Sequence, residues 1–192
     1  MNSNQKEVII IAGANGSGKT TFAKKLLEAF KYEFLNADEI AKRINPNDLT
    51  KVRIKAGKEF LSRVSTVIEN RKNFVLETTL SGKYIEKIIE MLKHKGYIIS
   101  IFFIFLESPE DCLNRIKQRV LKGGHDVPDE DVIRRYYRGK INFWSKYRNT
   151  VNKWYLMDNS QGNFIEICLG TGETMIVNDE MVFKKFLKGL KG

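Results

Sequence analysis

Residues 13–20 read GANGSGKT, from Gly13 to Thr20, and match the phosphate-binding pattern G-x-x-x-x-G-K-[ST] at every fixed position. An apolar run, 8–12, precedes this loop, and an apolar stripe with helical spacing follows it. A strand that delivers such a loop to a helix N-terminus lets backbone N–H groups surround phosphate oxygens, and the helix dipole favours their negative charge. The stretch therefore predicts a site for a nucleoside triphosphate.

Two side chains of this loop have expected roles. Lys19 is expected on the β- and γ-phosphates, and the hydroxyl of Thr20 on Mg²⁺. These roles imply ATP and Mg²⁺ as the cofactors. The residues expected to contact the nucleotide here are Gly13, Ala14, Asn15, Gly16, Ser17, Gly18, Lys19, Thr20 and Thr21.

Length and composition fit one domain over 1–192. The chain has 192 residues, is 42% hydrophobic and carries a net charge of +10. Such a charge suits acidic partners, among them nucleoside phosphates, sugar nucleotides, nucleic acid or an acidic protein, without choosing between them. The two cysteines, Cys112 and Cys168, are far apart, and no secretory pattern opens the chain, so a cytoplasmic setting is expected. The longest apolar run, 97–106, is about half a membrane span, so no membrane partner is expected.

Apolar runs alternate with helical patterns along the chain, which predicts an α/β fold of three layers around a mainly parallel sheet. Strands are expected at 7–12, 33–36, 73–77, 97–106 and 154–158, and a small β-hairpin at 163–169 and 173–177. Helices are expected from about 22 to 30, from 40 with a break near Pro46, at 81–94, from 109, from 128 to about 148, and at the end of the chain. Gly96 and Ser108 are expected to cap helices.

Acidic side chains follow two of the expected strands. Asp38 and Glu39 come after the second strand, at the edge where open α/β sheets bind ligands. A carboxylate there can accept the proton of an attacking hydroxyl, which is the role we favour for Asp38 over the alternative of a helix cap. Glu77 ends the third strand and can hold Mg²⁺ through water or bind substrate hydroxyls.

The segment 119–138 has the pattern of a lid that closes over the site. Arg119 ends one helix, Gly123-Gly124 permit movement, and Arg134, Arg135 and Arg138 follow on the next helix. Guanidinium groups in a closing lid meet the charge that develops on a transferred phosphoryl group. A solvated basic helix face remains the alternative for each arginine.

Four stretches together resemble the zeta-toxin-like P-loop kinases, in the small stand-alone branch of that family. They are GANGSGKTTFA, LNADEIA (35–41), VLETTLSG (75–82), and the run from Arg119 through GGHDVP to Arg134-Arg135-Tyr136-Tyr137. The resemblance covers about residues 8–160. The better-studied zeta toxins phosphorylate a sugar hydroxyl of UDP-N-acetylglucosamine with ATP and Mg²⁺, and a small antitoxin holds them inactive.

The resemblance implies roles for individual positions. Asp38 would be the general base, Arg119 a lid arginine that stabilises the transition state, and Glu77 with Thr79 would lie near the acceptor. Asn36 stands where the toxins have an additional acid, and their second lid arginine has no clean counterpart. His125 is closest to it in alignment, and Arg134 and Arg135 are closest in chemistry. Beyond the loop, the resemblance places Asp158 and Asn159 near the adenine, His125 at the substrate, and Arg134 among the catalytic residues.

The function expected from these features is transfer of the γ-phosphate of ATP to a hydroxyl, in a sugar nucleotide such as UDP-N-acetylglucosamine or a similar phosphorylated small molecule. An antitoxin is a candidate partner, and nucleic acid is a less favoured one. Two other functions stay open: a polynucleotide or nucleoside kinase, and an ATP-binding regulatory protein without turnover. Loss of transfer in Asp38→Asn with ATP binding kept would separate the kinase from the regulatory protein.

Overall fold

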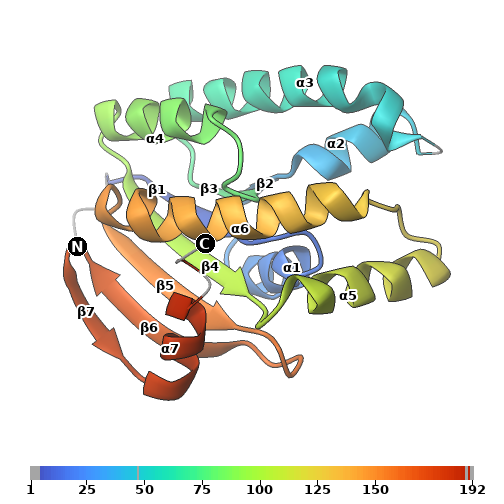
Figure 1. Cartoon of the computed structure of the whole chain (residues 1–192). Helices are drawn as coiled ribbons and strands as arrows, with labels where there is room; N and C mark the ends of the chain where they lie inside the picture. The colour runs from blue at the N-terminus through green and yellow to red at the C-terminus, as the bar shows by residue number, and fades with distance from the viewer. Residues whose placement is uncertain (1–4, 47, 189, 191–192) are drawn as a thin grey trace.

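The computed structural model describes residues 5–46, 48–188 and 190. Its centre is a seven-stranded sheet with the order β2-β3-β1-β4-β5-β6-β7 (Figure 1). Strands β1 to β5 pair in parallel, whereas β6 and β7 are antiparallel additions at one side. The strands are β1 (Glu7–Ala12), β2 (Glu33–Leu35), β3 (Phe74–Thr78), β4 (Ile98–Phe105), β5 (Lys153–Asp158), β6 (Ile165–Thr171) and β7 (Thr174–Val177).

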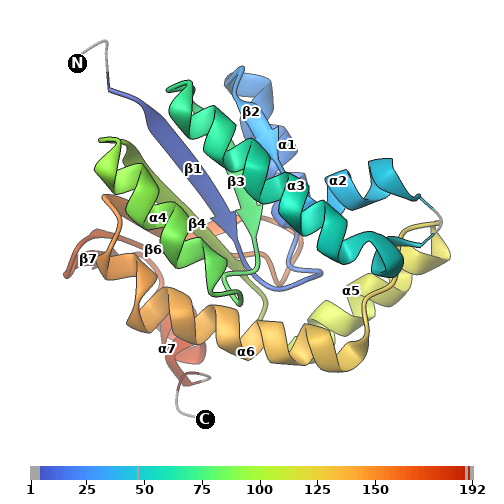
Figure 2. The ribbon, with the colours of Figure 1, turned by 90° about the horizontal axis from the view of Figure 1, so that it is seen from above.

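Helices cover both faces of the sheet, as parallel strands with apolar side chains on both faces require. The helices are α1 (Lys19–Ala29), α2 (Ala37–Ile44), α3 (Leu49–Glu69), α4 (Tyr84–His94), α5 (Pro109–Leu121), α6 (Asp129–Ser145) and α7 (Glu180–Lys188). Apolar side chains of α3, α4, α6 and α7 form the larger core cluster with one face, and α1 packs on the other. Figure 2 shows α3 lying in front of β3 and α4 in front of β4, with β1 visible between the two helices. The result is the expected three-layer α/β P-loop kinase fold.

The sequence signals at helix ends are confirmed. Ser108 caps α5, because its hydroxyl accepts from the backbone N–H of Asp111 at 3.1 Å, and Pro109 occupies the first turn. Gly96 follows α4 with a φ of 70°, in the left-handed region where glycine is favoured.

The hairpin expected at 163–177 is confirmed, because β6 and β7 pair antiparallel; β6 also pairs along β5, so the hairpin extends the main sheet. One expectation about the fold is corrected. The helix expected from Ser81 begins only at Tyr84, because Leu80 takes a φ of 54° and turns the chain after β3. The hydroxyl of Thr78 accepts from the Leu80 backbone N–H at 3.1 Å and stabilises this turn.

The carboxyl ends of the parallel strands meet at one edge of the sheet, which is where such folds bind ligands. In strand order 2-3-1-4-5 the loop after β1 lies between the loops that follow β3 and β4. The phosphate-binding loop, the start of α2 and the turn after β3 therefore come together. Of the helices in the described residues, none has both the length and the apolar character needed to span a bilayer.

Candidate functional site

The loop 13–20 connects β1 to α1 and depends on glycine at places where the backbone is crowded. Gly13 has a φ of 141°, and a Cβ there would lie 2.1 Å from the backbone oxygen of Ile104 at the end of β4. Gly18 precedes α1 with a φ of 99°, and a Cβ there would lie 2.5 Å from the Nδ2 of Asn159. A side chain at either position would clash, so the loop fits against β4 and the loop after β5 only with glycine.

Lys19 folds back over this loop. Its Nζ donates to the backbone oxygen of Ala14 at 2.8 Å and lies 3.9 Å from Oε1 of Glu77. Burial lowers the pKa of Lys19, and the carboxylates of Glu77 and Asp38 oppose that effect. The charge of Lys19 is thus stabilised at the phosphate loop by Glu77, in β3, and by Asp38, at the start of α2.

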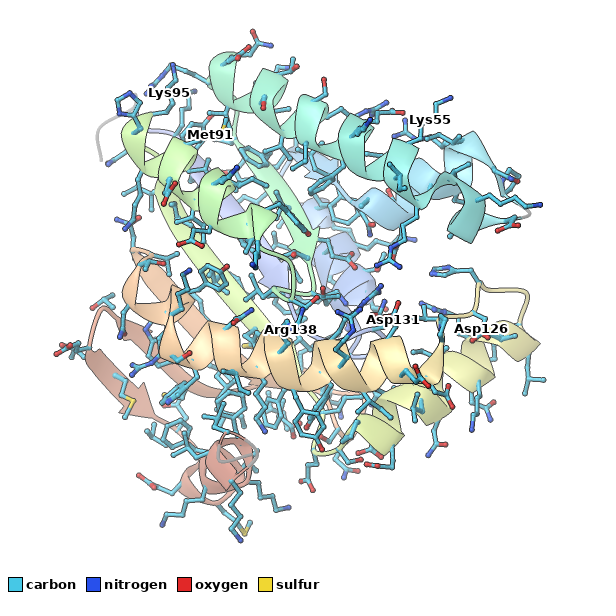
Figure 3. The ribbon with its side chains drawn as sticks, turned by 45° about the horizontal axis from the view of Figure 1, so that its top comes forward. Lys55, Met91, Lys95, Asp126, Asp131 and Arg138 are labelled. Carbon is cyan, nitrogen blue, oxygen red and sulfur yellow. The ribbon has the colours of Figure 1, made fainter. Side chains whose placement is uncertain are left out.

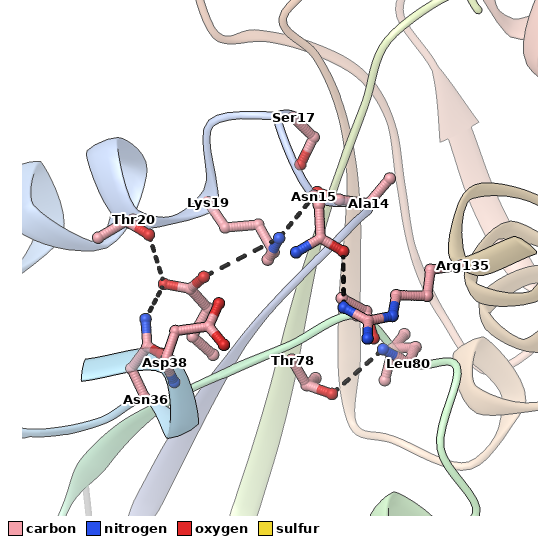
Figure 4. Close-up of polar contacts among 12 residues, drawn as sticks. Ala14, Asn15, Ser17, Lys19, Thr20, Asn36, Asp38, Thr78, Leu80 and Arg135 are labelled. Atoms are coloured by element: carbon pink, nitrogen blue, oxygen red, sulfur yellow. Dashed lines mark hydrogen bonds and ion pairs between the residues drawn. The ribbon is translucent and has the colours of Figure 1, made fainter. Parts of the chain in front are cut away.

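Glu77, at the end of β3, contacts both Lys19 and Thr20. Its Oε2 accepts from the hydroxyl of Thr20 at 2.9 Å and from Nδ2 of Asn36 at 2.8 Å (Figure 4). Burial raises the pKa of Glu77, while Lys19 and the Thr20 hydrogen bond act in the opposite direction. A buried carboxylate between a lysine and a hydroxyl is stable only in such a paired setting.

Thr20 and Glu77 fit a magnesium ion by their chemistry. Mg²⁺ is usually bound through one or two protein oxygens, water and substrate phosphates. A hydroxyl and a carboxylate oxygen 2.9 Å apart beside the phosphate loop supply such a donor set. No group of three or more His, Cys, Asp or Glu side chains suited to a metal occurs within the described residues, so a cage made of protein alone is not present there.

Asp38 lies at the start of α2 and differs from Glu77 in its surroundings. Its side chain is 57% exposed, whereas that of Glu77 is 7% exposed. The α2 cap is provided by Asn36, whose Oδ1 accepts from the backbone N–H groups of Asp38 at 2.7 Å and Glu39 at 3.3 Å. Asp38 is therefore not the capping residue, and its carboxylate is left to face the open side of the site.

His125, in the loop between α5 and α6, reaches Asp38 from the other side. Its Nε2 lies 4.0 Å from Oδ2 of Asp38. Burial, followed by the nearby Arg119, lowers the pKa of His125, so at neutral pH it is an uncharged neighbour of Asp38. Arg119 fixes this loop by donating to the backbone oxygen of His125 at 2.9 Å, and its buried Nε has no hydrogen-bond partner in the described part of the chain.

The helix α6 brings a second arginine to the phosphate loop. Nη1 of Arg135 donates to Oδ1 of Asn15 at 3.1 Å, and its Nη2 to Oδ2 of Asp131 at 3.0 Å. Asp131 also receives Arg134 and, from α3, Arg53 at 3.6 Å. Figure 3 shows Asp131 on the side of α6 that faces α3. The Asp131 carboxylate thus links α6 to Arg53 of α3 and, through Arg135, to the phosphate loop.

Comparisons with known proteins identify the family of this chain and its fold. The family model AAA_33, described as an AAA domain, matches residues 8–139, which include the phosphate loop, Asp38, Glu77 and the whole segment 119–138. The chain belongs to the AAA_33 family. A relative that is 33% identical over 132 residues, 69% of this chain and 94% of its own length, is an uncharacterized protein of Haemophilus influenzae.

Other proteins resemble this AAA_33 domain over most of its length. Guanylate kinase of Clostridium perfringens is 27% identical over 176 residues, 78% of this chain and 76% of that protein. A chain of the AvrRxo1-ORF1:ORF2 structure with ATP has a TM-score of 0.77 at 15% identity, covering 100% of this chain and 66% of its own. A chain from the PezAT toxin–antitoxin system of Streptococcus pneumoniae has a TM-score of 0.63 at 17% identity, with 100% and 86% covered. The two solved structures show the fold.

The other residues expected at the site of this AAA_33 domain have partners or surroundings outside the cluster around Glu77. Thr79 pairs its hydroxyl with that of Ser81 at 2.7 Å, beneath α6. Asp158 accepts from the backbone N–H and hydroxyl of Ser160, so it stabilises the turn after β5. Thr21 is exposed on α1. Asn159, in contrast, is buried under the phosphate loop and donates to the backbone oxygen of Ser17 at 2.8 Å.

Arg134, which the resemblance places among the catalytic residues, has a different setting from its neighbour Arg135. The Arg134 side chain is 44% exposed and pairs with Asp131, whereas that of Arg135 is 17% exposed and contacts the phosphate loop. The reason is helical phase, because the buried stripe of α6 runs through Val132 and Tyr136. Arg135 adjoins that stripe and Arg134 lies on the opposite side. The spacing of apolar residues along α6 is the sequence signal that could have shown which of the two arginines faces the site.

Proposed function

We propose that this protein is an ATP- and Mg²⁺-dependent phosphotransferase that moves the γ-phosphoryl group of ATP to a hydroxyl. The observation that carries the proposal is the contrast between two acids beside one lysine. Glu77 is buried and bonded to Thr20, whereas Asp38 is exposed at the same edge and acts on the charge of Lys19. One acid suits a metal and the other suits a substrate.

The residues divide the work as follows. Backbone N–H groups of 13–20 and Lys19 bind the phosphates, and Thr20 with Glu77 would hold Mg²⁺, directly or through water. The ion supplies charge neutralisation to the phosphate oxygens. Asp38 orients the acceptor hydroxyl and takes its proton as the new O–P bond forms. The bond from the γ-phosphorus to the bridging oxygen breaks, and ADP leaves with that electron pair.

The lid completes this arrangement. His125, uncharged at neutral pH, is placed to hydrogen-bond the acceptor beside Asp38. Arg119, with its unpaired buried Nε, fits a site where negative charge grows during transfer. Closure over the site excludes water, which would otherwise compete as the acceptor.

For the acceptor, we propose a sugar nucleotide such as UDP-N-acetylglucosamine or a similar phosphorylated small molecule in the cytoplasm. The fold shared with a PezAT chain supports a toxin-like kinase, and the complex with AvrRxo1-ORF2 in the AvrRxo1 structure supports a protein partner of antitoxin type. The +10 charge suits either an acidic acceptor or an acidic partner.

A second candidate follows from the 27% identity to guanylate kinase of Clostridium perfringens. If the acceptor is a nucleoside monophosphate, its phosphate is already ionised and requires no base. Asp38 would then bind or orient the substrate, and its loss would raise KM more than it lowers kcat.

The test is transfer from γ-labelled ATP with Mg²⁺ to a panel of sugar nucleotides, nucleosides, nucleoside monophosphates and RNA with 5′-hydroxyl ends. Label on a sugar-nucleotide hydroxyl supports the proposal, and label on a monophosphate supports the second candidate. Tight ATP binding with no labelled product from any acceptor would leave a nucleotide-binding protein without turnover and contradict both.

A further inference from the structure

The turn after β3 places a tyrosine at the ligand-binding edge of the sheet. Thr78 ends β3 directly after Glu77 and pairs in register with Ala12, the last residue before the phosphate loop. The hydroxyl oxygen of Tyr84, the first residue of α4, lies 3.0 Å from Oγ1 of Thr78. The Tyr84 hydroxyl therefore lies at the same edge as Glu77, and no step of the proposed reaction uses it.

The ring of Tyr84 is fixed by close packing. It makes an edge contact with the ring of Phe60, in α3, and the ring centres are 6.0 Å apart. Gly82 lies so near that a Cβ there would be 2.6 Å from Cε1 of Tyr84, so a larger residue would displace the ring. Because these contacts hold the ring, its hydroxyl group has a defined position and needs little ordering when a ligand binds.

The hydroxyl groups of Thr78 and Tyr84 have two protons between them, and the protein uses one. Oγ1 of Thr78 also accepts from the backbone N–H of Leu80 at 3.1 Å. The bond between the two hydroxyls uses one of their protons, and the described residues supply no acceptor for the other. Thr78 is 5% exposed, whereas Tyr84 is only partly buried. An unpaired donor costs less where water can reach it, so Thr78 donates to Tyr84 and the free proton lies on the Tyr84 oxygen.

The surroundings of Tyr84 keep this donor neutral and near the open side of the site. Burial is the main cause that raises the pKa of Tyr84, and the hydrogen bond with Thr78 opposes it. The Asp38 carboxylate raises the same pKa further and Arg135 lowers it, so Tyr84 is within electrostatic reach of both α2 and α6. At neutral pH the phenol is protonated. The edge thus offers a hydrogen-bond acceptor at Asp38 and a neutral donor at Tyr84.

We propose that Tyr84 binds the acceptor by donating a hydrogen bond to an oxygen next to the hydroxyl that Asp38 activates. The acceptor is then a polyol such as a sugar, in which one hydroxyl donates to Asp38 while a neighbouring oxygen accepts from Tyr84. A phosphate as the accepting group would have no proton for Asp38 and would be matched better by a cation than by a phenol. The inference rests on the proposed function, because it assigns a residue to the acceptor of that reaction.

The test compares Tyr84→Phe with the matched control Tyr97→Phe. Both variants keep the ring and remove one hydroxyl, and that of Tyr97 donates to the backbone oxygen of Lys72 at 2.9 Å, just before β4 begins and thus at the opposite edge of the sheet. Thermal melting first establishes that both variants are folded. Steady-state transfer from γ-labelled ATP with Mg²⁺ then gives kcat/KM for the acceptor that takes the label, and KM for ATP.

A binding measurement that requires no turnover accompanies the kinetics. The probe is UDP-N-acetylglucosamine, titrated into each protein saturated with Mg²⁺ and the non-hydrolysable ATP analogue AMP-PNP. Its dissociation constant from Tyr84→Phe, relative to the wild type and Tyr97→Phe, reports the hydrogen bond to a sugar directly.

For Tyr84→Phe we expect kcat/KM for the acceptor to fall about three- to tenfold, as the loss of one hydrogen bond to an uncharged group predicts. KM for ATP should stay within about twofold, and Tyr97→Phe should leave both constants within about twofold of the wild type. An unchanged kcat/KM for the acceptor in Tyr84→Phe would overturn the inference. An equal effect on ATP would overturn it as well, because it would indicate a structural role.

The inference and the proposed function fail in different ways. If the wild type labels a sugar and Tyr84→Phe does so equally well, the proposed function stands and the inference is wrong. If label is found only on the phosphate of a nucleoside monophosphate, the second candidate stands and the inference is wrong. If no acceptor is labelled, the proposed function is wrong and the binding measurement decides. Weaker binding of UDP-N-acetylglucosamine by Tyr84→Phe then keeps the inference, and equal or absent binding removes it.

Discussion

The side-chain amide of Asn36 and the carboxylate of Glu77 are 2.8 Å apart, with Nδ2 of Asn36 as the donor. The same asparagine caps α2 with its Oδ1, so one side chain fixes both the helix that carries Asp38 and the acid beside Thr20. The family that the sequence resembles has an acid at this position. In this chain, a neutral donor there lets Glu77 remain the one buried carboxylate beside Lys19 among the described residues.

Replacing Asn36 by Asp keeps the cap and exchanges the donor for a second carboxylate. We expect Asn36→Asp to lower the free energy of unfolding at pH 7 by about 1–3 kcal/mol, because Glu77 loses a partner and gains a like charge. The paired acids would have a raised pKa, so the loss should grow as pH rises from 5 to 7. Urea unfolding at both pH values measures it. Asn36→Ser, which keeps a capping oxygen without a charge, is the control, and equal pH dependence in both variants would contradict this account.

The proposed magnesium site predicts a metal phenotype for Glu77→Gln. The variant keeps the shape of the side chain and its hydrogen bonds to Asn36 or Thr20, but loses the charge. We expect the Mg²⁺ concentration for half-maximal activity to rise about 10–100-fold. Thr20→Ala should behave in the same way and Thr20→Ser should not. Titration of activity with Mg²⁺ at saturating ATP gives the answer, and an unchanged Mg²⁺ requirement in Glu77→Gln would place the ion elsewhere.

The buried Lys140 side chain, on α6, predicts that the stability of the protein depends on pH for a reason unrelated to the site. The residue is 3% exposed, its Nζ lies 4.7 Å from the ring centre of Phe186, and it forms no ion pair within the described part of the chain. Burial lowers its pKa to about 8. A base whose pKa falls on folding binds fewer protons when folded, so the free energy of unfolding should rise as pH increases from about 8 toward 10.5, the value of the unfolded chain.

Lys140→Met removes this effect. The variant should be more stable than the wild type at pH 7, by about 1 kcal/mol after the lost contact with the Phe186 ring is included. The difference should shrink between pH 8 and 10. Thermal unfolding across that range measures it, with Lys184→Met, at a position 72% exposed on α7, as the control. A difference that is the same at all pH values would contradict the assignment.

Local signals in the sequence predicted most of the fold. The five parallel strands, the phosphate loop and the caps at Ser108 and Gly96 each depend on residues close together in the chain, and all are confirmed. The pairing of β6 with β5 was not predicted, since the segment 163–177 contains a hairpin pattern but no mark of its outer partner.

The site was predicted in part. The phosphate loop, Asp38 and Glu77 were predicted as parts of the site because they lie at or just after the ends of strands. The structure brings Lys19, Thr20 and Glu77 together. The bond from Asn36 to Glu77 spans 41 residues, and that from Arg135 to Asn15 spans 120. Contacts between residues so far apart in the sequence cannot be predicted from the spacing of residues along the chain. The choice between Arg134 and Arg135 also depends on how α6 packs, which only the buried stripe of that helix indicates.

The central claim is that Asp38 activates the acceptor while 13–20 and Lys19 hold ATP. The most direct measurement is single-turnover transfer from γ-labelled ATP by wild type and Asp38→Asn, together with the ATP dissociation constant of each and with Glu39→Gln as the neighbouring control. We predict a rate about 10²–10⁴-fold lower in Asp38→Asn, ATP affinity within about twofold, and a control equal to the wild type. A normal transfer rate in Asp38→Asn would contradict the claim.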